Sequence, residues 1–141
     1  MKKTVLFLCT HNSARSQMAE AFLNTLYHDR YTAYSAGIEA TQVNPYVIHV
    51  MREINIDISR SQSKSMNDFH GKHFDYVVTV CDHAKEVCPF FPGDIILHQS
   101  FEDPSQFTGD DETILVNVRS VRDQIKTWII TTFSQEGREE I

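Results

Sequence analysis

The sequence predicts an α/β protein: a three-layer open sheet of about four parallel strands with helices on both faces. Short runs of consecutive apolar residues alternate with helical patterns along the chain, and such runs suit parallel strands that are covered on both faces. The length of 141 residues fits a single domain spanning 1–141. Ligands of such folds bind outside the carboxyl ends of the strands, so residues that follow strands are the first functional candidates.

The first three predicted elements are a strand, a helix and a strand. Residues 4–8 form a continuous apolar run and predict a buried strand. A helix follows from Arg15, because apolar residues recur at every fourth position: Met18, Phe22 and Leu26. Residues 31–35 predict the second strand, which ends at Gly37.

The middle of the chain continues the alternation. Asn44 is a typical N-cap and Pro45 is favoured in the first helical position, so a helix is predicted from there to about residue 53. Residues 57–72 are polar and predict a short helix with loops. Residues 75–80 form the clearest strand of the chain.

The chain closes with a strand and a long helix. Residues 94–98 predict a short strand. Apolar residues then recur at spacings of four and three, which marks an amphipathic helix: Ile114, Val118, Val121, Ile125 and Trp128. Residues 134–141 are polar and acidic, and we expect a tail there.

Composition excludes several function classes. Lys and Arg number 13 against 19 Asp and Glu, a net charge of −6, whereas nucleic-acid and anionic-membrane binders need basic surfaces. No apolar run approaches the ~18 residues of a membrane span. The first residues resemble a signal peptide, but the apolar stretch is short and lacks a cleavage site, so we expect a cytoplasmic protein.

The three cysteines are the first functional signal. An odd, small number argues against a secreted disulfide scaffold. Free cysteines are most often inert core residues. Cys9 and Cys81, however, each follow a predicted strand directly, which places both at the ligand-binding edge of the sheet.

The segment from Cys9 to Arg15 joins a strand to a helix and predicts an oxyanion-binding loop. Such a loop can turn successive backbone N–H groups inward at a helix N-terminus, and the guanidinium adds a fork that matches two oxygens. The same positive field is expected to lower the pKa of the Cys9 thiol and make it a nucleophile. Asn12 is expected to fix the loop through side-chain bonds, and Ser16 to donate to the sulfur. The predicted loop comprises Thr10, His11, Asn12, Ser13, Ala14, Arg15 and Ser16.

The alternative is a core thiol and an unrelated surface charge. A cysteine and an arginine at this spacing also occur by chance. The helix dipole disfavours a basic residue in the first turn unless an anion binds there, and this context favours the functional interpretation.

Cys81 and Cys88 are separated by six residues. In a helix they would lie about 10 Å apart, whereas a disulfide needs Cα atoms within ~7 Å, so joining them would unwind the segment. A redox pair is therefore predicted, with buried structural cysteines as the alternative. A metal site is disfavoured because the spacing is unusual for zinc and a second ligand pair is lacking. His70 and His73 lie in a polar loop without a cysteine or carboxylate cluster, and no metal is expected there.

The segment Cys9-Thr10-His11-Asn12-Ser13-Ala14-Arg15-Ser16 resembles the phosphate-binding loop of the low-molecular-weight protein tyrosine phosphatase fold, and the string through Ala21 is closer to its thioredoxin-coupled arsenate reductase branch. Further matches in the family's order cover most of the chain: Ser35-Ala36-Gly37, the segment 75–81, Cys88-Pro89 and Asp103-Pro104.

The resemblance implies a three-cysteine relay that reduces arsenate, for which phosphate and sulfate are mimics. Cys9 attacks arsenic, Cys81 attacks Cys9 and releases arsenite, and Cys88 then takes the disulfide from Cys81. Thioredoxin, with its reductase and NADPH, would be the reductant, and no tightly bound cofactor is expected. The resemblance assigns the acid to Asp103, although Asp-Pro is also a common turn dipeptide. Ser105 replaces a tyrosine that is frequent in the phosphatases, which favours the reductase branch.

Two departures from the family concern the loop. Some reductases bind potassium through residues that correspond to Asn12, Glu20, Ser35 and an aspartate. Lys64 stands at the aspartate's position, so its ammonium is expected to replace the ion and no potassium requirement is expected. His11 stands where many relatives have glycine, and it would be strained if that position needs a positive φ.

Two rival functions stay open at this point. One is a phosphatase that hydrolyses phosphomonoesters through a Cys9 phosphocysteine, and residual activity of this kind would also suit a reductase. The other is a non-catalytic oxyanion or redox sensor. In each case we expect a monomer that binds neither nucleic acid nor membrane.

Overall fold

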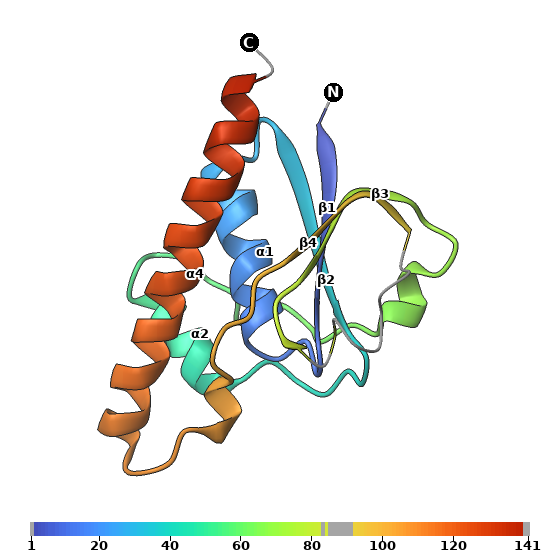
Figure 1. The fold of residues 1–141 in the computed structure, drawn as a ribbon. Coiled ribbons are helices and arrows are strands. Elements are labelled where there is room, and N and C mark those ends of the chain that lie inside the picture. Colours follow the sequence, from blue (N-terminus) through green and yellow to red (C-terminus); the bar gives the residue numbers. More distant parts are fainter. Residues whose placement is uncertain (1, 83, 85–91, 140–141) are drawn as a thin grey trace.

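The computed structural model describes residues 2–82, 84 and 92–139. Its centre is a four-stranded parallel sheet in the order β2-β1-β3-β4 (Figure 1). The strands are β1 (Lys3–Cys9), β2 (Tyr31–Gly37), β3 (Phe74–Thr79) and β4 (Gly93–His98). Each lies within two residues of a predicted strand at either end, and the predicted parallel α/β sheet is confirmed.

The α-helices of the described residues gather on one side of the sheet, while a short 3-10 helix lies on the other (Figure 1). They are α1 (Arg15–Leu26), α2 (Pro45–Arg52) and α4 (Asp111–Glu139), with α4 packed against both α1 and α2. The short helix is η1 (Met66–Phe69), which is where residues 57–72 predicted one. In α2, the Asn44 side chain accepts from the N–H of Tyr46, so the predicted cap is confirmed.

The expected acidic tail is wrong over most of its length, because α4 continues to Glu139. Gln135, Glu136 and Arg138 are helix formers, and no proline interrupts the segment after Phe133, so helical hydrogen bonding continues despite Gly137. Before that segment, Phe133 is fully buried and stacks edge-to-face on Tyr31 and Tyr76, which fixes the helix to the sheet.

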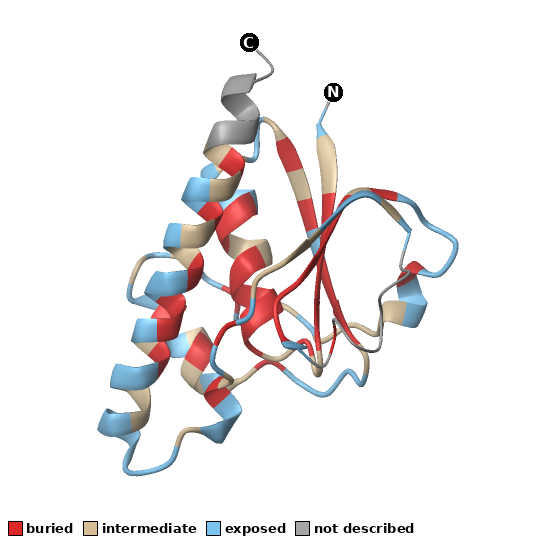
Figure 2. Cartoon of the chain, in the orientation of Figure 1, coloured by how far each residue is buried: buried red, intermediate tan, exposed pale blue. Residues whose placement is uncertain are grey.

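Burial follows the layers (Figure 2). The last five residues of β1 are all buried, as expected for a central strand that is covered on both faces. β4 is an edge strand and is mostly exposed, with Ile96 half exposed at 51%.

The ends of β1 and β3 lie side by side. The N–H of Val80 donates to the carbonyl of Leu8 at 3.0 Å, one residue before each of the two strand-end cysteines. The expectation that Cys9 and Cys81 share one edge of the sheet is therefore confirmed.

Candidate oxyanion site

The loop between β1 and α1 is shaped from outside by hydrogen bonds to its carbonyl oxygens. Four of these oxygens accept backbone N–H groups from residues 38–44 at 2.9–3.3 Å. The donors are Ile38 to Cys9, Glu39 to Thr10, Thr41 to His11, and Asn44 to Ser13. Among the hydrogen bonds between described residues, none has a backbone N–H of residues 11–15 as its donor. Because the carbonyls point outward, the N–H groups remain free to bind an anion.

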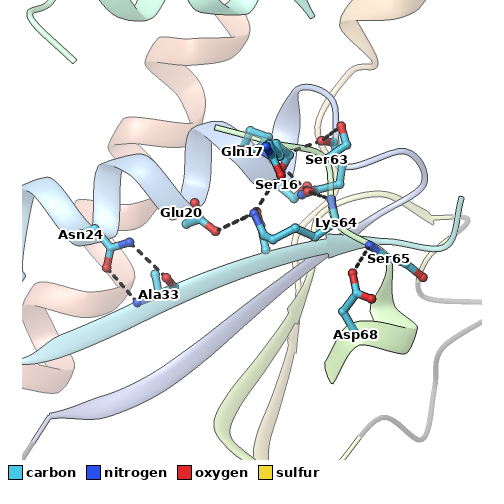
Figure 3. A network of polar contacts seen from close by, with 12 residues as sticks. Ser16, Gln17, Glu20, Asn24, Ala33, Ser63, Lys64, Ser65 and Asp68 are labelled. Carbon is cyan, nitrogen blue, oxygen red and sulfur yellow. Dashed lines mark hydrogen bonds and ion pairs between the residues drawn. The ribbon is translucent and has the colours of Figure 1, made fainter. Parts of the chain in front are cut away.

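Asn12 is the centre of the loop's polar contacts. It is fully buried, and its amide nitrogen donates to the Ser16 hydroxyl at 2.8 Å. Its amide oxygen accepts from the Lys64 N–H at 2.8 Å and from Gln17 Nε2 at 2.9 Å. Its carbonyl accepts from the Ser63 hydroxyl at 2.8 Å. These bonds join the loop to α1 and to residues 63–64 (Figure 3), and the predicted pinning role of Asn12 is confirmed.

The loop needs a left-handed residue at Asn12, with φ of 52°, and not at His11. Asparagine tolerates this conformation better than most residues, so His11 carries no such strain. Gly37 supports the loop from behind. A Cβ there would lie 2.7 Å from the Asn12 nitrogen and 2.9 Å from the Thr10 carbonyl oxygen, so only glycine fits.

Arg15 lies in the first turn of α1 with its side chain only 9% exposed. Its guanidinium donates to the Phe101 carbonyl at 3.1 Å and lies 3.5 Å from the Asp103 carboxylate. Its buried Nε has no hydrogen-bond partner. A buried, incompletely bonded guanidinium is costly, and a bound oxyanion would remove that cost. The first turn of α1 holds no acidic residue to compete with such an anion.

Asp103 caps the short helix η2 (Pro104–Gln106) and also faces the loop. Its carboxylate accepts from the Ser105 N–H and hydroxyl, both at 2.9 Å, and its other oxygen is the one near Arg15. Asp103 therefore fits both interpretations of the Asp-Pro pair. Its carboxylate stabilises a turn, and it also lies near Arg15 at the site.

The two strand-end thiols meet beside the loop. Cys9 and Cys81 are both buried and reduced, and they lie close enough for their thiols to interact. The Cys81 sulfur also lies 3.4 Å from the Thr10 hydroxyl and accepts the Ala84 N–H at 3.4 Å. Cys88 lies outside the described residues.

The pKa values of the two thiols differ from the sequence-based expectation for Cys9. The hydrogen bond to Cys81, together with burial, raises the pKa of Cys9, although Arg15 and the Thr10 N–H lower it. The hydrogen bond from Cys9, followed by that of Thr10, lowers the pKa of Cys81 to about 5. Two adjacent thiolates would repel, so the pair favours a single negative charge, and Cys81 is the more acidic of the two thiols.

Lys64, which was expected to take the place of a potassium ion, lies close to Glu20. Its ammonium is 3.6 Å from the Glu20 carboxylate, which accepts the Ser35 hydroxyl at 2.9 Å (Figure 3). The ammonium also donates to the Gln62 carbonyl at 3.2 Å. A positive charge therefore already lies beside Glu20, next to the Asn12 contacts.

The other loop residues have structural contacts. The carbonyl of the buried Ala14 accepts the Met18 N–H at 2.9 Å and so begins α1, while Ser16 accepts from Asn12. A bond from Ser16 to the Cys9 sulfur is not among the contacts of the described residues. Sequence reasoning missed the Phe101 carbonyl that orients Arg15, because nothing local relates positions so far apart.

Two further kinds of site find no support in the part of the chain that the structure describes. There, no group of three or more His, Cys, Asp or Glu side chains is placed to hold a metal ion. His73 instead pairs with Asp94 at 2.8 Å on the surface. No helix within the described ranges has the length and apolar character that crossing a membrane requires.

Comparisons with known proteins agree with this geometry. The family model described as low molecular weight phosphotyrosine protein phosphatase matches residues 4–136. An arsenate reductase of Halalkalibacterium halodurans is 44% identical over 138 residues, 97% of this chain and 99% of that protein. A solved arsenate reductase in the phosphate binding state is 32% identical with a TM-score of 0.80, covering 96% of this chain and 98% of that one. A thioredoxin-dependent arsenate reductase of Corynebacterium glutamicum is 26% identical with a TM-score of 0.62, covering 93% and 63%.

Replacing Gly37 with alanine is expected to distort the loop, because the new Cβ would overlap the backbone of residues 10–12. Phosphate affinity, measured by calorimetry, should fall at least about tenfold, a loss of ~1.4 kcal/mol. Gly71→Ala is the control, since a Cβ there meets no atom within 4 Å and its cost is limited to the positive φ of 83°. Equal phosphate affinity in Gly37→Ala and wild type would contradict this account of the loop.

The thiol pair predicts an unusual titration. Thiolate absorbance near 240 nm should show one thiolate forming as the pH rises through about 5, with the second proton of the pair lost only well above the ordinary thiol range. In Cys81→Ser the neighbouring negative charge is gone, so the pKa of Cys9 should fall relative to wild type. A wild-type protein with no thiolate below pH 8 would refute the shared charge.

Proposed function

The chain belongs to the low molecular weight phosphotyrosine protein phosphatase family, and on that premise we propose that it reduces arsenate to arsenite through a relay of Cys9, Cys81 and Cys88. The observation that carries the proposal is the second buried thiol, Cys81, which interacts with the first beside the anion loop. Hydrolysis of a phosphate ester needs one nucleophilic cysteine, whereas reduction needs a second thiol within reach of the first.

The first step is attack of the Cys9 sulfur on arsenic. The inward N–H groups and Arg15 hold the arsenate oxygens, and Cys9 passes its proton to the neighbouring Cys81 thiolate as it attacks. An S–As bond forms and an oxygen leaves as water. Asp103 is held near Arg15, where it is positioned to protonate the departing oxygen.

The second step moves two electrons to arsenic. Cys81 attacks the Cys9 sulfur and gives its proton to an oxygen of the departing arsenite; an S–S bond forms, and the S–As electron pair leaves with arsenite. Arsenate and two thiols thus give arsenite, one disulfide and one water. The Thr10 hydroxyl and the Ala84 N–H, both 3.4 Å from the Cys81 sulfur, support its thiolate.

The relay is completed by exchange with Cys88, which attacks Cys81 and releases Cys9. Thioredoxin is the proposed reductant of the resulting Cys81–Cys88 disulfide, with its reductase and NADPH restoring it. A similar protein that is thioredoxin-dependent supports this choice of donor. We further propose that the enzyme works in the cytoplasm as a monomer, without a tightly bound cofactor.

A second activity has its own support in the geometry. The loop, Cys9, Arg15 and Asp103 are sufficient for hydrolysis of a phosphomonoester through a phosphocysteine, and none of these groups requires Cys81. We propose residual phosphatase activity alongside arsenate reduction.

Cysteine variants separate the two activities. Cys9→Ser should abolish both arsenate reduction and phosphate-ester hydrolysis, because it removes the shared nucleophile. Cys81→Ser and Cys88→Ser should stop repeated turnover of arsenate while largely keeping ester hydrolysis. NADPH loss coupled through thioredoxin and its reductase measures the first activity, and p-nitrophenol release measures the second. Multiple turnovers of arsenate in both Cys81→Ser and Cys88→Ser would rule out the relay.

Potassium should not activate the enzyme, because the Lys64 ammonium already lies near Glu20. The specificity constant for arsenate is expected to stay the same when potassium replaces sodium at equal ionic strength. Lys64→Asp replaces the cation with a carboxylate, so this variant should lose activity in sodium and recover it in potassium. A several-fold activation of the wild type by potassium would contradict the role of Lys64.

A further inference from the structure

One side chain outside the proposed relay, His98, links the residues on both sides of Cys81. Its Nδ1 lies 2.7 Å from the Thr79 hydroxyl, two residues before the cysteine. Its Nε2 lies 3.1 Å from the Asp82 carboxylate, one residue after it. Both ring nitrogens are therefore engaged, and the short segment that carries the Cys81 thiol is held at its two ends.

The backbone explains why His98 reaches both partners. Thr79 and His98 are the last residues of the adjacent parallel strands β3 and β4, and they pair in register. The pairing continues past the strands, since the Gln99 N–H donates to the Thr79 carbonyl at 3.0 Å and the Phe101 N–H to the Val80 carbonyl at 3.3 Å. The imidazole therefore lies next to the end of β3, just before the chain reaches Cys81.

The chemistry of the three groups fits a hydrogen bond at each ring nitrogen. An ionised carboxylate only accepts, so Nε2 carries the hydrogen and donates to Asp82. The Thr79 hydroxyl suits Nδ1 because a hydroxyl can both donate and accept. The two bonds are unequal in strength. The ion-pair partner Asp82 is 76% exposed, which makes that contact weak, whereas Thr79 is only 4% exposed and its loss would leave a sheltered ring nitrogen unbonded.

We propose that His98 is a positioning residue for Cys81: by joining Thr79 and Asp82, it keeps the second thiol buried and facing Cys9. The inference deepens the proposed function and rests on it for its catalytic meaning. When the bonds are intact, the Cys81 sulfur stays among its donors, Thr10, Ala84 and Cys9, where it can attack the Cys9 sulfur. When they are lost, the segment departs from this geometry more often, and Cys81 becomes more accessible and reacts less often with Cys9.

The same contact elsewhere on the sheet supplies a matched control. His73 pairs with Asp94 at 2.8 Å through the same kinds of atoms, but both side chains are more than half exposed and neither adjoins a cysteine. The test compares wild type with His98→Leu, which removes both bonds, and with His73→Leu. His98→Asn is the conservative variant, because its amide places a polar atom near the position of Nδ1 and can keep the bond to Thr79.

The first readout needs no arsenate. Reduced protein is treated with iodoacetamide, and alkylation of Cys81 is followed by peptide mass spectrometry, with Cys9 as the internal reference. His98→Leu should raise the Cys81 rate by about three- to tenfold, the factor expected for one or two lost hydrogen bonds. His98→Asn should lie between His98→Leu and wild type, and His73→Leu should match wild type.

The second readout is formation of the Cys9–Cys81 disulfide in a single turnover with arsenate. His98→Leu should slow this step by a similar factor while leaving KM for arsenate and p-nitrophenyl phosphate hydrolysis within about twofold of wild type. A loss of fold would instead lower every activity together, and the His98→Asn variant then carries the comparison. If arsenate is not reduced at all, the proposed function fails while the alkylation result still tests His98. Unchanged Cys81 alkylation in folded His98→Leu or in His98→Asn would overturn the positioning role.

Discussion

The site depends on one constraint, which is that the carbonyl oxygens of the loop between β1 and α1 are bonded from outside. Residues 38–44 supply the donors for most of them, and Ser63 and Gln17 supply those for Asn12. Because these carbonyl oxygens point away from the loop, its backbone N–H groups point toward the centre of the loop. The close approach of Gly37 behind the loop keeps these distances short. A negatively charged chain can therefore bind an anion, because the deciding charges are local and surface charges are screened within ~8 Å at physiological salt.

The second thiol changes the electrostatics of the first. In an isolated loop, Arg15 and the backbone N–H groups would make Cys9 the ionised residue. Here Cys81 lies close enough to share a proton with it, and the Thr10 hydroxyl and the Ala84 N–H favour charge on Cys81. Cys81 is thus the more acidic thiol of the pair, and Cys9, the sulfur that is proposed to attack first, holds its proton more strongly. Each sulfur ionises more easily when the other carries no negative charge. This suits the proposed reaction, in which Cys9 attacks first and Cys81 attacks second.

Residues 98–103 connect the two halves of the site. His98 contacts the strand end before Cys81, Phe101 bonds to Val80 through its N–H and to Arg15 through its carbonyl, and Asp103 faces Arg15. The segment that orients the anion-binding guanidinium therefore also borders the relay cysteine.

The sequence alone determined the strands, most helix boundaries and the shared edge of Cys9 and Cys81, because these depend on periodicity, caps and residues close in the chain. The continuation of α4 to Glu139 was missed, since polar helix formers carry no apolar period. Tertiary structure decided the rest. It placed the left-handed residue of the loop at Asn12 and not at His11. It brought the Phe101 carbonyl to Arg15 and set His98 beside Thr79 and Asp82. It also made Cys81 the more acidic thiol of the pair. Each of these depends on atoms that meet only when strands distant in the sequence align, and a pKa in particular reports the whole surroundings of a group and not its neighbours in the chain.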